Sequence, residues 1–91
     1  MSNELETINR LIQDGKTDDA IGLLNGCIDA GESSDKIFFL LGKAYNKLGN
    51  LRQAIYNYNV AVEKNPDSPA KEALEQIQEI LAFYNTDLYN P

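Results

Sequence analysis

Residues 36–66 read KIFFLLGKAYNKLGNLRQAIYNYNVAVEKNP, and this stretch decides the fold. Its apolar residues recur at intervals of three and four, which is the period of an amphipathic helix and not the alternation of a strand. They are Ile37, Phe38, Leu41, Ala44, Tyr45 and Leu48, then Leu51, Ala54, Ile55, Tyr58, Ala61 and Val62. Between the two runs, Gly49 is suited to end one helix and Asn50 to cap the next. The stretch therefore predicts two helices joined by a tight turn.

A weaker copy of this pattern lies 34 residues upstream. Gly15 stands 34 residues before Gly49, and four further pairs keep that spacing: Ala20 and Ala54, Ile21 and Ile55, Asn25 and Asn59, and Ile28 and Val62. In the turn of this copy we expect Gly15 to end one helix and Thr17 to cap the next. A fixed period of this length predicts a stack of similar helical units, whose function lies on a surface rather than in a catalytic pocket.

A further helix is expected after the second copy, because Ser68 is a good cap and Pro69 suits the first helical position. Its apolar residues fall on one stripe: Ala70, Ala73, Leu74, Ile77, Ile80, Leu81 and Tyr84. A helix that is apolar on one side only suits the end of a stack, since its outer face meets water. We predict helices over residues 3–14, 18–29, 35–48, 51–64 and 69–84.

Composition excludes several classes of partner. Eight basic residues against fourteen acidic ones give a net charge of −6, which argues against a nucleic acid or an anionic membrane as the partner. No stretch approaches the ~20 consecutive apolar residues of a membrane span, and the polar, acidic N-terminus is unlike a signal peptide. The sequence therefore predicts a cytoplasmic protein.

The residues of catalysis and metal binding are scarce. The chain has no histidine and a single cysteine, Cys27, so the commonest general base and the commonest metal ligand are missing. We predict a protein that is not an enzyme and that has no metal or cofactor. Cys27 matches Ala61 in the repeat and is expected to be a small buried residue. Gly22 and Gly26, one turn apart, are expected to allow close packing against another helix.

Eight residues of the second copy resemble the tetratricopeptide-repeat signature in order and spacing: Phe38, Leu41, Gly42, Tyr45, Ala54, Tyr58, Ala61 and Pro66. Phe38 stands where the family usually has tryptophan. Gly42 and Ala54 are small where two helices must approach closely. The resemblance implies an all-α, right-handed superhelix in one domain, with a degenerate repeat at 1–34, a well-matched repeat at 35–68, a capping helix at 69–84 and a tail at 85–91.

Members of this family are mostly adaptors that hold a peptide or helix in a concave groove lined by the first helix of each repeat. The side chains expected to face such a groove here are Asn9, Lys36, Phe39, Lys43, Asn46 and Lys47. We interpret them as a peptide-binding site in which Phe39, which has no evident core role, is the anchor and the lysines meet carboxylates. Alternatively, this is a solvated face, or the lysines pair with Glu72, Glu75 and Glu79 of the last helix.

One subclass of the family clamps the C-terminal carboxylate of chaperones with basic and asparagine side chains. Here Leu5 and Leu40 occupy two of the clamp positions, and the last helix supplies no lysine or arginine to it. A chaperone tail is therefore not the expected partner.

The C-terminal segment carries aromatic and aliphatic residues, among them Phe83, Leu88 and Tyr89. They are expected to fold back and complete the cap or, alternatively, to form a homodimer contact. In the second case the protein would be a self-associating structural protein and not an adaptor.

Overall fold

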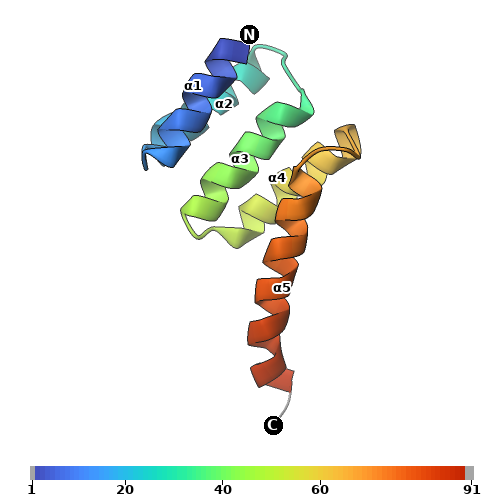
Figure 1. The fold of residues 1–91 in the computed structure, drawn as a ribbon. Coiled ribbons are helices and arrows are strands. Elements are labelled where there is room, and N and C mark those ends of the chain that lie inside the picture. The colour runs from blue at the N-terminus through green and yellow to red at the C-terminus, as the bar shows by residue number, and fades with distance from the viewer. Residues whose placement is uncertain (1, 90–91) are drawn as a thin grey trace.

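The computed structural model describes the backbone of residues 2–89 and the side chains of residues 4–83 (Figure 1). Within the described backbone there are only helices and the turns that join them. The helices are α1 (Ser2–Gln13), α2 (Thr17–Asp29), α3 (Asp35–Lys47), α4 (Leu51–Lys64) and α5 (Ala70–Tyr89). The predicted all-α helical-repeat fold is confirmed.

Glycines end α1 and α3 as expected. Gly15 has a φ of +85° and Gly49 a φ of +82°, a left-handed conformation that glycine adopts without a steric cost. Asn50 caps α4, since its side chain accepts a hydrogen bond from the backbone N–H of Gln53 at 3.3 Å. The corresponding prediction, that Thr17 caps α2, is wrong. The cap position of α2 is occupied by Lys16, one repeat length before Asn50, and its side chain makes no capping hydrogen bond, while Thr17 is the buried first residue of α2.

The last helix begins as predicted but is longer. The hydroxyl of Ser68 accepts a hydrogen bond from the N–H of Ala70 at 3.1 Å, so Ser68 does cap this helix. At the other end α5 continues to Tyr89, five residues beyond its predicted end, and projects from the rest of the stack (Figure 1). Residues 85–89 contain neither glycine nor proline, so nothing in them breaks a helix. They do not fold back, and Asn90 and Pro91 lie outside the described residues.

The core consists of two clusters on either side of α3. The first joins α1, α2 and α3 through Ile8, Ile12, Ala20, Leu24, Cys27, Ile37, Leu40, Leu41 and Ala44. The second joins α4 and α5 through Ala54, Tyr58, Ala61, Ala70, Leu74 and Ile77. Three aromatic residues of α3 pack against both clusters: Phe38, Phe39 and Tyr45. The aromatic side chains of α3 therefore hold the two halves of the stack together.

Small residues play different roles in the two repeats. Gly42 is buried, and a Cβ built on it would collide with the ring of Tyr58, while Ala54 has no exposed surface. The predicted close approach of α3 and α4 is thus confirmed. The prediction for Gly22 and Gly26 is wrong, since both are exposed and a Cβ on either would meet nothing within 4 Å. They lie on a face of α2 that no described helix covers.

Candidate functional site

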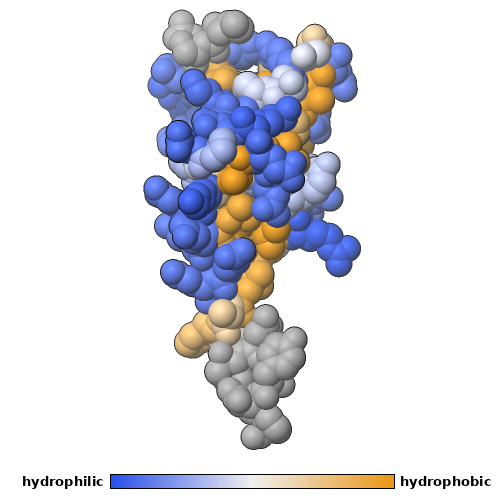
Figure 2. All heavy atoms as spheres, turned by 90° about the vertical axis from the view of Figure 1, so that its right-hand side faces the viewer, coloured by the Kyte–Doolittle hydropathy of each residue, from blue (hydrophilic) through white to orange (hydrophobic). Residues whose placement is uncertain are grey.

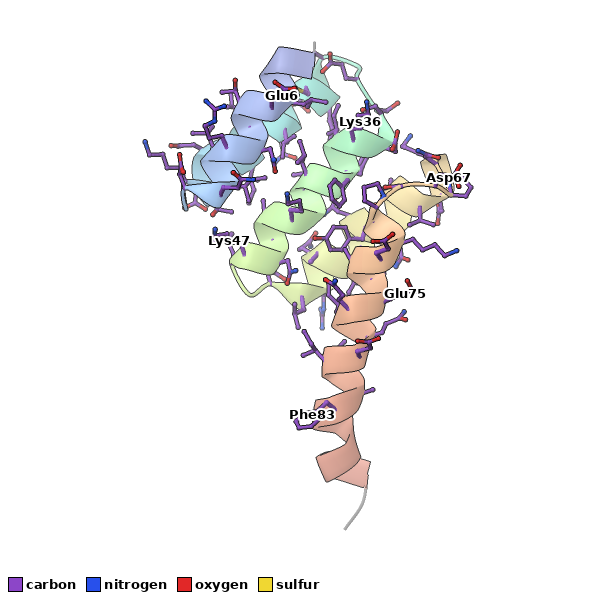
Figure 3. All side chains as sticks on the ribbon, viewed as in Figure 1. Glu6, Lys36, Lys47, Asp67, Glu75 and Phe83 are labelled. Atoms are coloured by element: carbon purple, nitrogen blue, oxygen red, sulfur yellow. The ribbon has the colours of Figure 1, made fainter. Side chains whose placement is uncertain are left out.

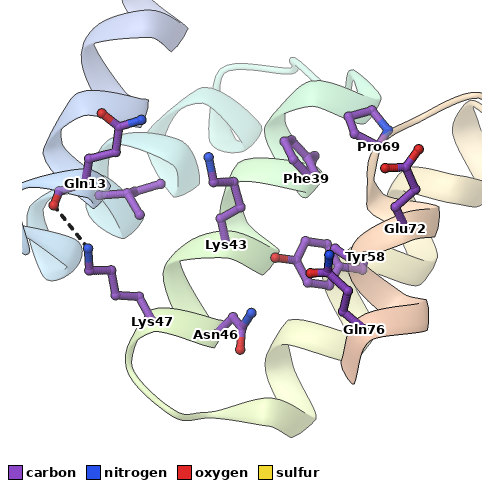
Figure 4. A pocket seen from close by; sticks show the side chains of 11 residues that line it. Gln13, Phe39, Lys43, Asn46, Lys47, Tyr58, Pro69, Glu72 and Gln76 are labelled. Atoms are coloured by element: carbon purple, nitrogen blue, oxygen red, sulfur yellow. Dashed lines mark hydrogen bonds between the residues drawn. The ribbon is translucent and has the colours of Figure 1, made fainter. Parts of the chain in front are cut away.

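A groove runs along α3 between α1 and α5. Its larger part, a hollow of about 480 Å³ drawn in Figure 4, lies where the three helices face one another. Side chains of α1, α3, α4 and α5 line it: Ile12, Gln13, Phe39, Lys43, Asn46, Lys47, Tyr58, Pro69, Glu72, Ala73 and Gln76. A smaller hollow of about 290 Å³ adjoins it between α1 and α3, and Phe39 and Lys43 line both.

The structure brings the six predicted groove residues together. Phe39, Lys43, Asn46 and Lys47 line the larger hollow, while Asn9 and Lys36 line the smaller one. Tyr58 and the residues of α5 were not predicted to line the groove. Pro69, Ala73 and Gln76 are separated by four and three residues and could have been assigned to one helix face.

Phe39 lies where the two hollows meet. Its ring centroid is 5.9 Å from that of Tyr58, with the planes tilted by 39°, and the Nζ atom of Lys43 is 5.6 Å from the Phe39 centroid. The ring is half-buried and packs against both core clusters. The expectation that Phe39 has no core role is therefore wrong, because its ring packs against residues of both clusters, Tyr58 of α4 among them.

Tyr58 forms the floor of the larger hollow beneath Phe39. It is 1% exposed, and this burial raises the pKa of its hydroxyl, while a hydrogen bond with the side chain of Asn46 acts in the opposite direction. The hydroxyl therefore stays protonated at neutral pH and keeps a hydrogen-bonding group at the base of the groove.

Two lysines of α3 are held by α1. Lys43 Nζ donates a hydrogen bond to Asn9 Oδ1 at 2.8 Å, and Lys47 Nζ donates to the carbonyl oxygen of Gln13 at 3.1 Å. Gln13 is the last residue of α1, where unpaired carbonyls attract a cation. Both contacts join residues 34 positions apart, one repeat length, so they are equivalent links between the first helices of the two repeats.

The acidic side chains of α5 remain apart from these lysines. Glu72 lines the same hollow as Lys43 and Lys47 from the opposite wall (Figure 4). Among the described side chains, residues 4–83, no ion pair joins the lysines of α3 to Glu72, Glu75 or Glu79. The alternative in which these residues pair is wrong, and Lys43 and Lys47 donate to Asn9 and Gln13 of α1 instead.

Cys27 is buried in the first cluster, as predicted. Its Sγ lies 3.7 Å from Glu4 Oε1, and burial together with the nearby carboxylates of Glu32 and Glu4 raises the pKa of the thiol to about 11. The thiol is therefore protonated and unreactive at neutral pH. Within residues 4–83 no group of His, Cys, Asp and Glu side chains is arranged to hold a metal ion.

Comparison with known proteins identifies similar folds. A model of the tetratricopeptide repeat matches residues 37–68. The solution NMR structure of Bacteroides fragilis protein BF1650 is similar with a TM-score of 0.82 and 42% sequence identity, over 94% of this chain and 88% of that chain. The chain belongs to the tetratricopeptide-repeat family. A search of curated proteins gave no match.

Tetratricopeptide repeats generally mediate protein–protein interactions and are generally not catalytic. The groove of this tetratricopeptide-repeat chain lies on the side of α1 and α3, the first helices of its two repeats. In the described part of the chain, no helix is both long and apolar enough to cross a membrane.

The far end of α5 exposes apolar surface. Ile80 is 52% exposed and Phe83 is 72% exposed, although Ile80 was expected in the packed stripe. Viewed from the side, apolar residues form a band bordered by hydrophilic ones that descends onto the projecting end of the helix (Figure 2). The side chains of Leu88 and Tyr89, the other two residues of the predicted homodimer contact, lie outside the described residues.

Proposed function

We propose that this protein is a non-catalytic interaction module that binds a peptide or helix of another protein in the groove along α3. The observation that carries the proposal is the position of Phe39, where the two hollows meet, with Lys43 beside its ring. A half-buried aromatic residue in a concave site is the usual anchor of a protein interface.

The lysines support this assignment because they are already positioned. Lys43 and Lys47 are held by hydrogen bonds to α1, so a ligand that approaches them meets cations whose side chains have lost part of their freedom. Lys36 adds a third positive charge at the other end of α3 (Figure 3). We expect these charges to select carboxylate-bearing ligands and to accelerate their association.

Capture of partners from the native cell tests the proposal. The protein is immobilised in three forms: the wild type, Lys43→Glu in the groove, and Lys71→Glu, an exposed lysine of α5 that does not line the groove. We expect a partner that is retained by the wild type and by Lys71→Glu and is lost with Lys43→Glu. Equal retention by all three forms would show that the groove is not the binding surface.

Self-association is the second candidate function, and the exposure of Phe83 at the end of α5 favours it. Light scattering of the wild type and of Phe83→Ser measures the mass in solution. A dimer that Phe83→Ser dissociates supports this candidate, and a monomeric wild type removes it. The predicted cytoplasmic location stays a prediction.

A further inference from the structure

Helix α5 carries two lines of residues with different environments. Ala70, Leu74 and Ile77 are buried in the cluster with α4, and Leu81 packs against it. A second line, turned by about 110° around the helix at ~100° per residue, consists of Ala73, Gln76, Ile80 and Phe83. Ala73 and Gln76 line the groove. Ile80 and Phe83 therefore continue the groove wall toward the end of α5.

This continuation leaves the groove open on one side. Helix α5, with 20 residues, is longer than the 13-residue α3, and Figure 1 shows its second half projecting past α3 and α4. The exposure of Ile80 and Phe83, which lie on this half, agrees with that. Figure 3 shows Phe83 on the side of α5 toward α1 and α3, and Glu75 on the other side.

The spacing of the second line indicates the shape of its ligand. Residues 73, 76, 80 and 83 are separated by three, four and three positions, which is the a and d spacing of a helix that packs along another helix. Successive residues of this line are about 5 Å apart along α5, whereas side chains on one face of an extended peptide are about 6.6 Å apart, so an extended peptide falls out of step with the line. The geometry therefore favours a helix as the occupant.

The two sides of the groove differ in charge, with three lysines and the carboxylate of Glu6 on the side of α1 and α3 and only carboxylates beside the line on α5. Lys36, Lys43 and Lys47 stand on α3, while Glu72 and Glu79 stand on α5 beside the line of Ile80 and Phe83. In the side chains that the structure describes, these two sets form no ion pairs with each other. A helix lying between the walls would present one flank to lysines and the other to glutamates.

We propose that the groove binds an amphipathic helix with an apolar seam, acidic residues on the flank toward α3 and basic residues on the flank toward α5. This inference rests on the proposed function of the groove and names the class of its partner. A second copy of α5 fits less well, because antiparallel pairing along this line would bring Glu72 and Glu79 against the same glutamates of the other copy.

Three synthetic helices test the charge pattern. Each has about three heptads with the same leucine seam. One has glutamate on one flank and lysine on the other, the second has glutamate on both flanks, and the third has lysine on both. Fluorescence anisotropy with nanomolar labelled peptide measures the affinity and keeps self-association of the peptides low. We expect the mixed-flank peptide to bind about tenfold more tightly than either of the others.

Variants with matched controls test the two parts of the site. Glu72→Lys should shift the preference toward the all-glutamate peptide, whereas Glu75→Lys, the same change on the outer side of α5, should not. Ile80→Ser should weaken the mixed-flank peptide severalfold, whereas Leu23→Ser should not, since Leu23 is 48% exposed on α2 and outside the groove. Circular dichroism checks that each variant is folded.

The outcomes separate this inference from the proposed function. Equal binding of the three peptides, no binding of any, or equal effects of Ile80→Ser and Leu23→Ser would overturn the assignment of a mixed-flank helix. The groove itself is judged by the capture experiment with Lys43→Glu. A native partner that depends on Lys43 while the peptides are not discriminated would leave the proposed function intact and remove the inference.

Discussion

Gly42 of α3 lies directly against the ring of Tyr58 of α4, so closely that the Cβ it lacks would overlap the ring. Both residues are buried, and the ring of Tyr58 also contacts that of Phe39 at the floor of the groove. The packing that joins the two helices of the repeat therefore also shapes the candidate binding surface.

Gly42→Ala should destabilise the protein. Because the ring of Tyr58 is buried and fills the space next to Gly42, the added methyl group can be accommodated only by a shift of the helices. Such a shift should cost about 1–3 kcal/mol. Urea denaturation followed by circular dichroism measures the free energy of unfolding. Unchanged unfolding would contradict the observed contact.

Gly26→Ala should have the opposite effect. Gly26 is in the middle of α2 and is exposed, and a Cβ there meets nothing within 4 Å. Alanine should therefore stabilise the helix by roughly 0.5–1 kcal/mol through its higher helix propensity. The same urea titration measures the gain, and a loss of stability would mean that another helix does pack on this face.

Asn50→Ala should remove the cap of α4. The hydrogen bond from the N–H of Gln53 to the Asn50 side chain is lost, at a cost of about 0.5–2 kcal/mol. Asn59→Ala is the matched control, because Asn59 is exposed within the same helix. Thermal melting compares the two variants, and equal melting temperatures would show that the cap does not contribute.

Phe39→Ala should weaken folding as well as binding. The ring is half-buried and touches both core clusters, so its loss should cost less than the about 3–5 kcal/mol of a fully buried phenylalanine but more than a surface change. Lys43→Glu should leave the melting temperature nearly unchanged, since its contacts lie at the groove surface. Melting curves of both variants therefore show which one reports on binding alone.

The thiol of Cys27 should react slowly until strongly alkaline pH. Its pKa is raised from 9.0 to about 11, so the native thiol should gain reactivity toward a neutral disulfide reagent only as the pH approaches 11, and the urea-unfolded protein near pH 9. Because the folded state disfavours the thiolate, this group's contribution to stability is complete below pH 9 and is lost as the pH rises through about 11. Identical pH profiles for native and unfolded protein would contradict the burial.

The sequence predicted helix ends and caps correctly where one residue type is suited to one local role. Gly15 and Gly49 end helices because they adopt a positive φ, and Asn50 and Ser68 cap helices because their side chains accept backbone hydrogen bonds. The prediction for Thr17 was wrong because α2 begins at Thr17 itself, so the cap position falls on Lys16, whose side chain makes no capping hydrogen bond.

Other features depended on which helix lies opposite. The local pattern does not distinguish a glycine pair that packs against another helix from one that faces water. The prediction that Gly22 and Gly26 allow close packing was therefore wrong. Ile80 belongs to the apolar residues of α5 in sequence, yet it is exposed because α5 extends past α4 and α3.

By itself, the sequence determined the helical repeat, its period and six of the residues that line the groove, because helix periodicity and small residues at a close approach are local properties. Only the tertiary structure decided which residues the lysines contact and which helices form the walls of the groove. Lys43 and Lys47 reach Asn9 and Gln13 of α1 and leave Glu72 unpaired on α5, since the positions of the helices set which partners lie within hydrogen-bonding distance.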